Sequence, residues 1–335
     1  MNFLSKIDWF LDKEYISSPL DLSIYRMLLC TVLFCEMPVE KWLYDAPDFM
    51  FSPTLSPVIW LTAFPPGFVF TAIHCLMVLS AVCLFLGIKP RAAGISLFTT
   101  LLILRAFAYS TGKINHDDIL ILVILILFTF SHWNQYSWSK SAQGAQTPPT
   151  GSDGFPLAML AFVIAFWMAT AGWQKITTDW LNWDYSVVYR YVFNHHEING
   201  YDSEFVVWSL REFPTWLWEL GDWATIVFEL SGLALFWKRR LLSWWLAAAC
   251  WFHLGVHVLM SIEFGAAISA YAIFVPWSRL GLAPIVKPSL PVLLWTIPGL
   301  VALWLLPFSI ISTGVVWLAP IIPIILILKR DQAQP

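Results

Sequence analysis

The chain contains 335 residues, of which 59% are hydrophobic and 12% are charged. Soluble domains carry about 25% charged residues, so this composition predicts an integral membrane protein of the all-α class. The formal net charge of −3 leaves no basic footprint for nucleic acid. We therefore expect membrane lipids, and not nucleic acid, as partners.

The hydrophobic segments predict a polytopic helical bundle of about 8–10 transmembrane helices, because roughly 20 apolar residues span a bilayer. Several segments are short or are interrupted by one charged residue. The chain has no charge between Lys287 and Lys329, which predicts a C-terminal helical hairpin over 288–328. The other predicted spans are Leu20–Met37, Phe68–Leu86, Ala92–Ser110, Ile119–Ser131, Phe155–Trp173, Trp223–Trp237, Leu241–Ser261 and Phe264–Trp277.

These spans are interpreted as a single membrane domain over residues 1–335. Its first four helices lie within 20–141, and a flexible cytoplasmic linker covers 142–153. The core follows over 154–282. Within the core, a long outer loop over 176–221 is rich in aromatic residues. We expect that loop to lie on the membrane surface as short amphipathic pieces.

The positions of Lys and Arg predict the orientation, because cytoplasmic loops carry an excess of both. With both termini in the cytoplasm, twelve of them fall on the cytoplasmic side and four on the opposite side. We therefore expect a multi-pass protein of a bacterial inner membrane. The cytoplasmic set is Lys6, Lys13, Lys89, Arg91, Lys140, Lys238, Arg239, Arg240, Arg279, Lys287, Lys329 and Arg330, and the outer set is Lys41, Lys113, Arg190 and Arg211.

Lys175 stands at the end of a predicted spanning helix on the outer side. The stretch from Gly154 to Gln174 contains no Asp, Glu, Lys, Arg or His, and Lys175 follows it directly. Two interpretations are open. An amine buried away from water can stay neutral and act as a base, whereas an ordinary boundary lysine extends its ammonium group to water.

Other titratable residues also lie within apolar segments, where a charge is costly and each is therefore a functional candidate. Arg105 forms either a structural salt bridge or part of an outward-facing polar pocket. Glu229 must pair, be protonated or bind a ligand. His253 and His257 are four residues apart and share one helical face, which suits helix-to-helix hydrogen bonding or a quinone pocket. The same spacing could ligate a metal or haem, but two histidines are too few for a metal site on their own, and no metal is predicted.

The segment Asn115-His116-Asp117-Asp118 opens a predicted helix on the same outer side. Asn115 suits the N-cap, and the two acids suit the first turn of the helix dipole. This structural interpretation leaves His116 unexplained, and a histidine can carry a proton near neutral pH.

Four motifs, in this order, resemble the HTTM (horizontally transferred transmembrane) family, and in particular the membrane domain of vitamin K-dependent gamma-carboxylase. The resemblance covers about residues 110–280. The motifs are Asn115-His116 followed by Gln135-Tyr136-Ser137-Trp138-Ser139, Ala171-Gly172-Trp173-Gln174-Lys175 with Asp179-Trp180, Glu229-Leu230-Ser231, and Phe252-His253 followed by Met260-Ser261-Ile262.

The resemblance implies an enzyme that is quinol-dependent, carboxylase-like or epoxidase-like, with an extracytoplasmic pocket. Lys175 would be the base that deprotonates a reduced quinone resembling vitamin K hydroquinone, which is the implied cofactor. His116 would be the second catalytic residue. The residues expected around the quinol are Arg105, Asp179, Trp180, Glu229, His253 and His257.

Two other functions stay open at this point. The chain could be a non-enzymatic binding, maturation or export partner of a secreted or periplasmic peptide, with the loop 176–221 as its contact surface. It could also be a transporter that uses intramembrane charges such as Arg26 and Glu229, although no inverted repeat is evident.

Overall fold

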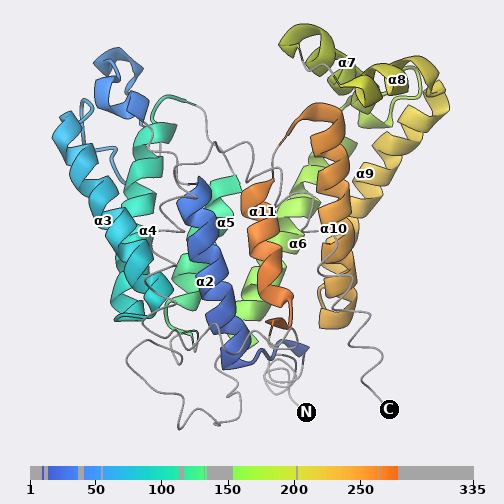
Figure 1. Cartoon of the computed structure of the whole chain (residues 1–335). Helices are drawn as coiled ribbons and strands as arrows, with labels where there is room; N and C mark the ends of the chain where they lie inside the picture. Colours follow the sequence, from blue (N-terminus) through green and yellow to red (C-terminus); the bar gives the residue numbers. More distant parts are fainter. Residues whose placement is uncertain are drawn as a thin grey trace, which may run out of the picture. The chain divides into compact units, whose positions relative to one another are not determined.

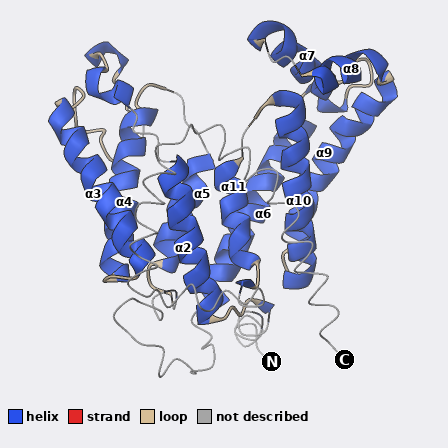
Figure 2. Cartoon of the chain, in the orientation of Figure 1, coloured by secondary structure: helices blue, strands red, loops and turns tan. Residues whose placement is uncertain are grey.

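The structure, a computed structural model, describes residues 10, 14–36, 41–53, 56–112, 117–131, 133, 154–200, 203–262 and 264–277. Figure 2 shows that their regular structure is helical, without a strand in the described part of the chain, which confirms the predicted all-α class there. The α-helices are α2 (Pro19–Glu36), α3 (Gly67–Leu86), α4 (Pro90–Tyr109), α5 (Asp117–Phe128), α6 (Gly154–Ile176), α7 (Val187–Asn199), α8 (Glu204–Glu212), α9 (Thr215–Leu235), α10 (Arg239–Met260) and α11 (Gly265–Tyr271). Short 3-10 helices are η1 (Lys41–Asp45), η2 (Asp48–Met50), η5 (Asp179–Leu181) and η6 (Ala272–Phe274).

Four of these helices, α3, α4, α6 and α10, are long and apolar enough to cross a membrane. Each begins and ends within three residues of the span predicted from the sequence. Their agreement has a simple cause, since an unbroken apolar run of about 20 residues has few alternatives to a helix. The helices α5 and α11 are apolar but shorter. The predicted linker 142–153 and hairpin 288–328 lie outside the described residues.

The predicted outer loop 176–221 is largely helical. It contains η5, α7 and α8, and α9 begins at Thr215, eight residues before the predicted start at Trp223. The sequence did not predict that α9 begins at Thr215, because Glu219 and Asp222 interrupt the apolar pattern. Both side chains are buried inside the protein and are not exposed on a loop.

The contacts divide the chain into two compact units. In the described residues, the first unit consists of 10, 14–15 and 157–264, and carries nearly all of α6 together with α7, α8, α9 and α10. The second contains the described residues within 16–156 and 265–277, and carries α2, α3, α4, α5, α11 and the first three residues of α6. The chain therefore returns to the second unit at Gly265.

In the second unit, α3 and α4 lie side by side, α4 contacts α5, and α11 contacts both α5 and α2 (Figure 1). Arg26 on α2 is almost fully buried there. Its Nη1 donates a hydrogen bond to the carbonyl oxygen of Trp133 at 2.7 Å, and the Ser23 hydroxyl donates to the same oxygen at 3.3 Å. The buried guanidinium thus has a structural role in joining α2 to the residue Trp133.

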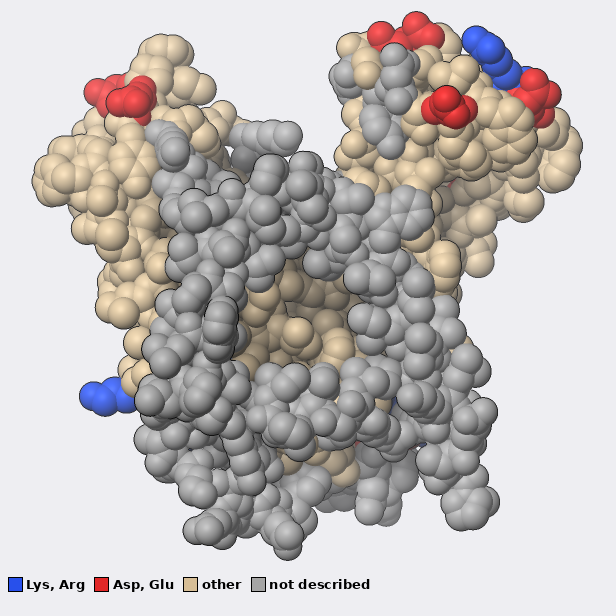
Figure 3. Space-filling model, viewed as in Figure 1, with Lys and Arg blue, Asp and Glu red and all other residues tan. Residues whose placement is uncertain are grey.

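In the first unit, α9 packs along α10, while α7 contacts α8, α9 and α10 (Figure 1). A buried cluster of Val192, Val206, Trp218 and Met260 joins one residue from each of these four helices. Figure 3 shows that charged side chains gather on the surface over α7 and α8. The helices α7 and α8 therefore form a polar and aromatic cap on one end of this unit.

Candidate functional site

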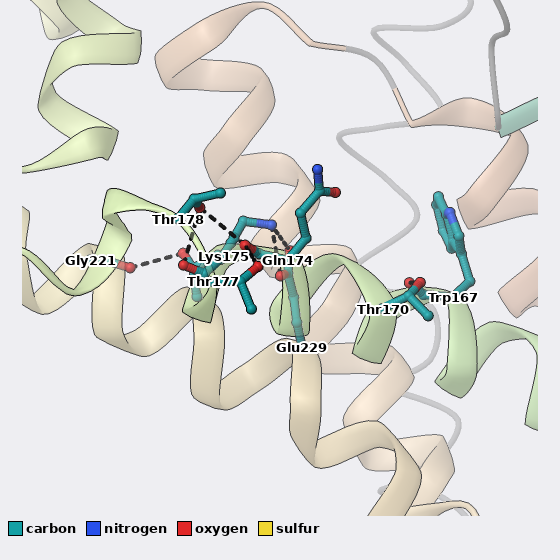
Figure 4. Close-up of polar contacts among 9 residues, drawn as sticks. Trp167, Thr170, Gln174, Lys175, Thr177, Thr178, Gly221 and Glu229 are labelled. Atoms are coloured by element: carbon teal, nitrogen blue, oxygen red, sulfur yellow. Dashed lines mark hydrogen bonds and ion pairs between the residues drawn. The ribbon is translucent and has the colours of Figure 1, made fainter.

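Lys175 and Glu229 form a close ion pair between α6 and α9. The Lys175 Nζ atom lies 2.7 Å from Oε2 and 2.8 Å from Oε1 of Glu229, so one ammonium group contacts both carboxylate oxygens. Figure 4 shows the lysine side chain reaching from the last turn of α6 to the glutamate. The side chains are 18% and 7% exposed. Lys175 is therefore neither a headgroup-facing lysine nor an isolated amine.

Gly172 allows this pair to form. It lies on α6, three residues before Lys175, and residues of α9 lie close to it. A Cβ atom on Gly172 would lie 3.0 Å from the Cβ of Glu229 and 3.2 Å from the Cγ of Leu230. Such contacts are tighter than ordinary van der Waals packing, so a larger residue at position 172 would require Glu229 and Leu230 to move by a few tenths of an ångström.

The end of α6 is closed by two threonines and one indole. The hydroxyls of Thr177 and Thr178 both donate hydrogen bonds to the carbonyl oxygen of Gln174, at 2.9 and 3.1 Å. These bonds satisfy a carbonyl that the helix end would otherwise leave open. The chain then turns into η5, and the Trp180 ring lies 5.0 Å from Lys175 Nζ. That distance is within the range of a cation–π contact.

A cavity of ≈ 580 Å³ opens beside the lysine. Its walls come from the end of α6, from η5 and from one side of α7, so that amide, hydroxyl, cationic and aromatic groups surround the same space. Glu229 is not among the described residues that line it. The lining residues are Ala171, Gln174, Lys175, Thr178, Asp179, Trp180, Tyr185, Val187, Arg190, Tyr191 and Asn194.

The polar wall of the cavity contains Asp179, Tyr185 and Arg190. A hydrogen bond to Asp179 raises the pKa of the Tyr185 hydroxyl above its ordinary value, and the nearby Arg190 charge opposes that shift. The Tyr185 hydroxyl is therefore held as a proton donor. The guanidinium of Arg190 provides a positive charge on the exposed side of α7.

Helix α7 is fixed in place by an acid from another helix. The Asp222 carboxylate on α9 accepts hydrogen bonds from the backbone N–H groups of Val187 and Val188 at 2.9 and 2.8 Å. Ser186 is the N-cap, and its hydroxyl oxygen accepts a hydrogen bond from the Tyr189 N–H at 3.2 Å. Because the first turn is bound in this way, Arg190, Tyr191 and Asn194 face the cavity.

The structure brings together four of the residues predicted from the sequence: Lys175, Glu229, Asp179 and Trp180. His253 and His257 lie on α10 of the same unit but do not line the cavity in the described part of the chain. The His253 ring stacks on Phe264 with centroids 4.1 Å apart. Arg105 lies on α4 in the second unit, and His116 lies outside the described residues.

Sequence reasoning missed Gln174, Tyr185, Arg190 and Asn194 as cavity residues, and Asp222 as the anchor of α7. A usable pattern was present for two of them. Arg190 and Asn194 are four residues apart, and Ser186 is a typical N-cap, so a helix beginning at Val187 would place both on one face. The contribution of Asp222 depends on α9 packing against α7, which has no local sequence pattern.

The described residues contain no group of three or more His, Cys, Asp or Glu side chains placed to hold a metal ion.

The chain matches no protein-family model, no curated protein and no solved structure. The chemical character of the site therefore has to be argued from its own residues.

Proposed function

We propose that this chain is a polytopic protein of a bacterial inner membrane, and that the cavity at the end of α6 binds a lipophilic quinol and removes a proton from it through Lys175. The family resemblance to HTTM proteins is part of this proposal. Four helices of sufficient length and apolar composition support the membrane assignment. The observation that carries the chemistry is the Lys175–Glu229 pair, which is mostly buried yet adjoins an aromatic cavity.

The cavity suits the head of a quinol in size and in chemistry. Small-molecule sites measure about 300–1,000 Å³, and ≈ 580 Å³ lies within that range. The lining is mostly polar, with aromatic faces from Trp180 and Tyr191. Trp180 and Tyr191, whose ring centroids are 6.3 Å apart, offer faces for a planar ring. Gln174 and Asn194 provide amides that can bind its two oxygens.

The chain's part in such a reaction is to take a hydroxyl proton and to hold the resulting anion. The Lys175 amine would accept the proton, and Arg190 would place a positive charge near the oxygen that becomes negative. One quinol and one O₂ would then give one quinone epoxide and one water. The oxygen supplies the oxidant, so no other redox partner is required.

The test uses the purified protein with 2-methyl-1,4-naphthohydroquinone and oxygen, with chromatographic measurement of the epoxide. We expect turnover by the unaltered chain and a loss of at least about 100-fold in Lys175→Ala, as for removal of a general base. The matched control is Lys238→Ala. Lys238 also forms an ion pair, at 2.8 Å with Glu14, but its side chain is 57% exposed, and its loss should leave turnover unchanged. Equal turnover by the Lys175→Ala protein would refute the proposal.

A second function, binding of a secreted or periplasmic peptide, is favoured by one separate observation. Large apolar side chains at Trp183, on α7, on α8 and at the start of α9 are exposed, in keeping with a contact surface for another molecule. This alternative predicts that peptide binding is retained in Lys175→Met and lost in Trp208→Ala. That result would favour it over quinol chemistry. The most exposed of these side chains are Trp183, Tyr191, Ile198, Trp208, Trp216 and Leu220.

A further inference from the structure

The ion pair limits what Lys175 can do alone. The ammonium group donates hydrogen bonds to both oxygens of the Glu229 carboxylate, at 2.7 and 2.8 Å, and an ammonium nitrogen has no lone pair. Before the lysine can accept a proton, it must give one away. The side-chain contacts of Nζ in the described residues are the two Glu229 oxygens and the face of Trp180. Of these groups, the carboxylate alone can accept a proton.

We propose that Glu229 is the residue that finally holds the proton removed from the substrate, and that Lys175 passes it on. This inference rests on the proposed function. The quinol O–H bond breaks and an N–H bond forms at Lys175, while a different N–H bond of Lys175 breaks and an O–H bond forms at Glu229. The pair changes from ammonium–carboxylate to ammonium–carboxylic acid. Its net charge rises by one, which balances the single negative charge of the quinolate.

The burial of the two partners fits this division of roles. Glu229 is 7% exposed and does not line the cavity, whereas Lys175 is 18% exposed and does. A substrate in the cavity can therefore reach the amine but not the carboxylate. Burial favours the neutral form of a carboxyl group, and the adjacent Lys175 ammonium favours its charged form. The negative quinolate formed beside the amine offsets the effect of the ammonium.

The other acid beside the cavity is less suited to this role. Asp179 lines the cavity directly, and it accepts a hydrogen bond from Tyr185. It is also exposed, so solvent stabilises its charged form. A proton held on Asp179 would exchange with water, and the positive charge formed beside the quinolate would be lost. Glu229 keeps that charge inside the protein.

The experiment is infrared difference spectroscopy of the full-length protein when 2-methyl-1,4-naphthohydroquinone is added without oxygen. We expect a new carboxylic-acid C=O band that shifts in D₂O. The band should be absent in Glu229→Gln and in Lys175→Met, because the first lacks the acceptor and the second lacks the relay. It should persist at a shifted frequency in Glu229→Asp. The control, Glu14→Gln, alters the exposed pair with Lys238 and should leave the band unchanged.

A wrong proton relay and a wrong proposed function give different experimental results. If epoxide formation requires Lys175 but no acid band forms, or the band survives in Glu229→Gln, the proton relay is wrong and the proposed function stands. If neither epoxide formation nor the acid band depends on Lys175, the proton relay and the proposed function are both wrong. A Glu229→Gln protein that does not fold leaves Glu229→Asp as the test, since an unshifted band in that variant also overturns the assignment.

Discussion

Gly172 and Glu229 lie so close that a Cβ on the glycine would be 3.0 Å from the Cβ of the glutamate. The two residues belong to α6 and α9, and their approach places the carboxylate within reach of Lys175, one turn further along α6. The small size of residue 172 therefore permits the close approach of Glu229 to α6. The site depends on a close contact between helices as much as on the charged groups themselves.

A bulkier residue at position 172 should separate the two helices and weaken the pair. We expect Gly172→Leu to destabilise the protein by about 1–3 kcal/mol through overpacking, and to increase the reaction of Lys175 with an amine-selective reagent. Unfolding curves and mass spectrometry of the labelled lysine provide the two measurements. Gly221→Leu is the control, because nothing lies within 4 Å of a Cβ at that helical position. Equal effects of the two variants would contradict this account.

The stability of the Lys175–Glu229 pair can be measured by a double-mutant cycle. Lys175→Met should cost roughly 3–5 kcal/mol, because it leaves a buried carboxylate without its partner. Glu229→Gln should cost less, since the more exposed lysine can reach the cavity. The double variant should be more stable than Lys175→Met alone, since no unpaired charge is left. Additive losses in denaturant unfolding would show that the two groups are not coupled.

The sequence predicted some parts of this site and missed others. The ends of α3, α6 and α10 followed from unbroken apolar runs, and Lys175 was correctly placed at a helix end. Its partner was not predictable, since Glu229 lies 54 residues away and the contact depends on Gly172. The start of α9 was missed because Glu219 and Asp222 look like loop residues until the helices that bury them are known.

Asp222 should control the position of α7 and, through it, the cavity wall. Asp222→Ala removes the acceptor of two backbone hydrogen bonds, and we expect a loss of about 1–2 kcal/mol, as for removal of a strong helix cap. Amide hydrogen exchange at Val187 and Val188 should become faster, while exchange in the middle of α10 should stay the same. The exposed Asp184 offers the control Asp184→Ala. Unchanged exchange in the Asp222 variant would show that other contacts fix α7.

Arg190 should contribute to ligand binding without supporting the fold. It lines the cavity and is exposed, so Arg190→Ala should leave the unfolding midpoint within experimental error. Its loss should weaken the binding of 2-methyl-1,4-naphthohydroquinone about 3- to 10-fold, because one favourable charge beside the ligand oxygen is removed. Arg211 on α8 is also exposed but is not a cavity residue, and Arg211→Ala should bind normally. Equal affinities for all three proteins would exclude Arg190 from the site.

The proposed orientation makes a prediction for the two ends of α9. Its 21 residues extend over about 31 Å at 1.5 Å per residue, which compares with about 30 Å for a hydrocarbon core, although α9 carries three acids and is not among the four apolar helices described above. The helix α7 lies at one end, and the turn before Lys238 lies at the other. A maleimide that cannot cross membranes should label Glu197→Cys in intact cells. It should label Trp237→Cys only after permeabilisation, with the unaltered chain as the blank for its native cysteines. If Trp237→Cys were labelled in intact cells and Glu197→Cys only after permeabilisation, the cavity would face the cytoplasm. That result would overturn the extracytoplasmic assignment, which follows from the distribution of Lys and Arg.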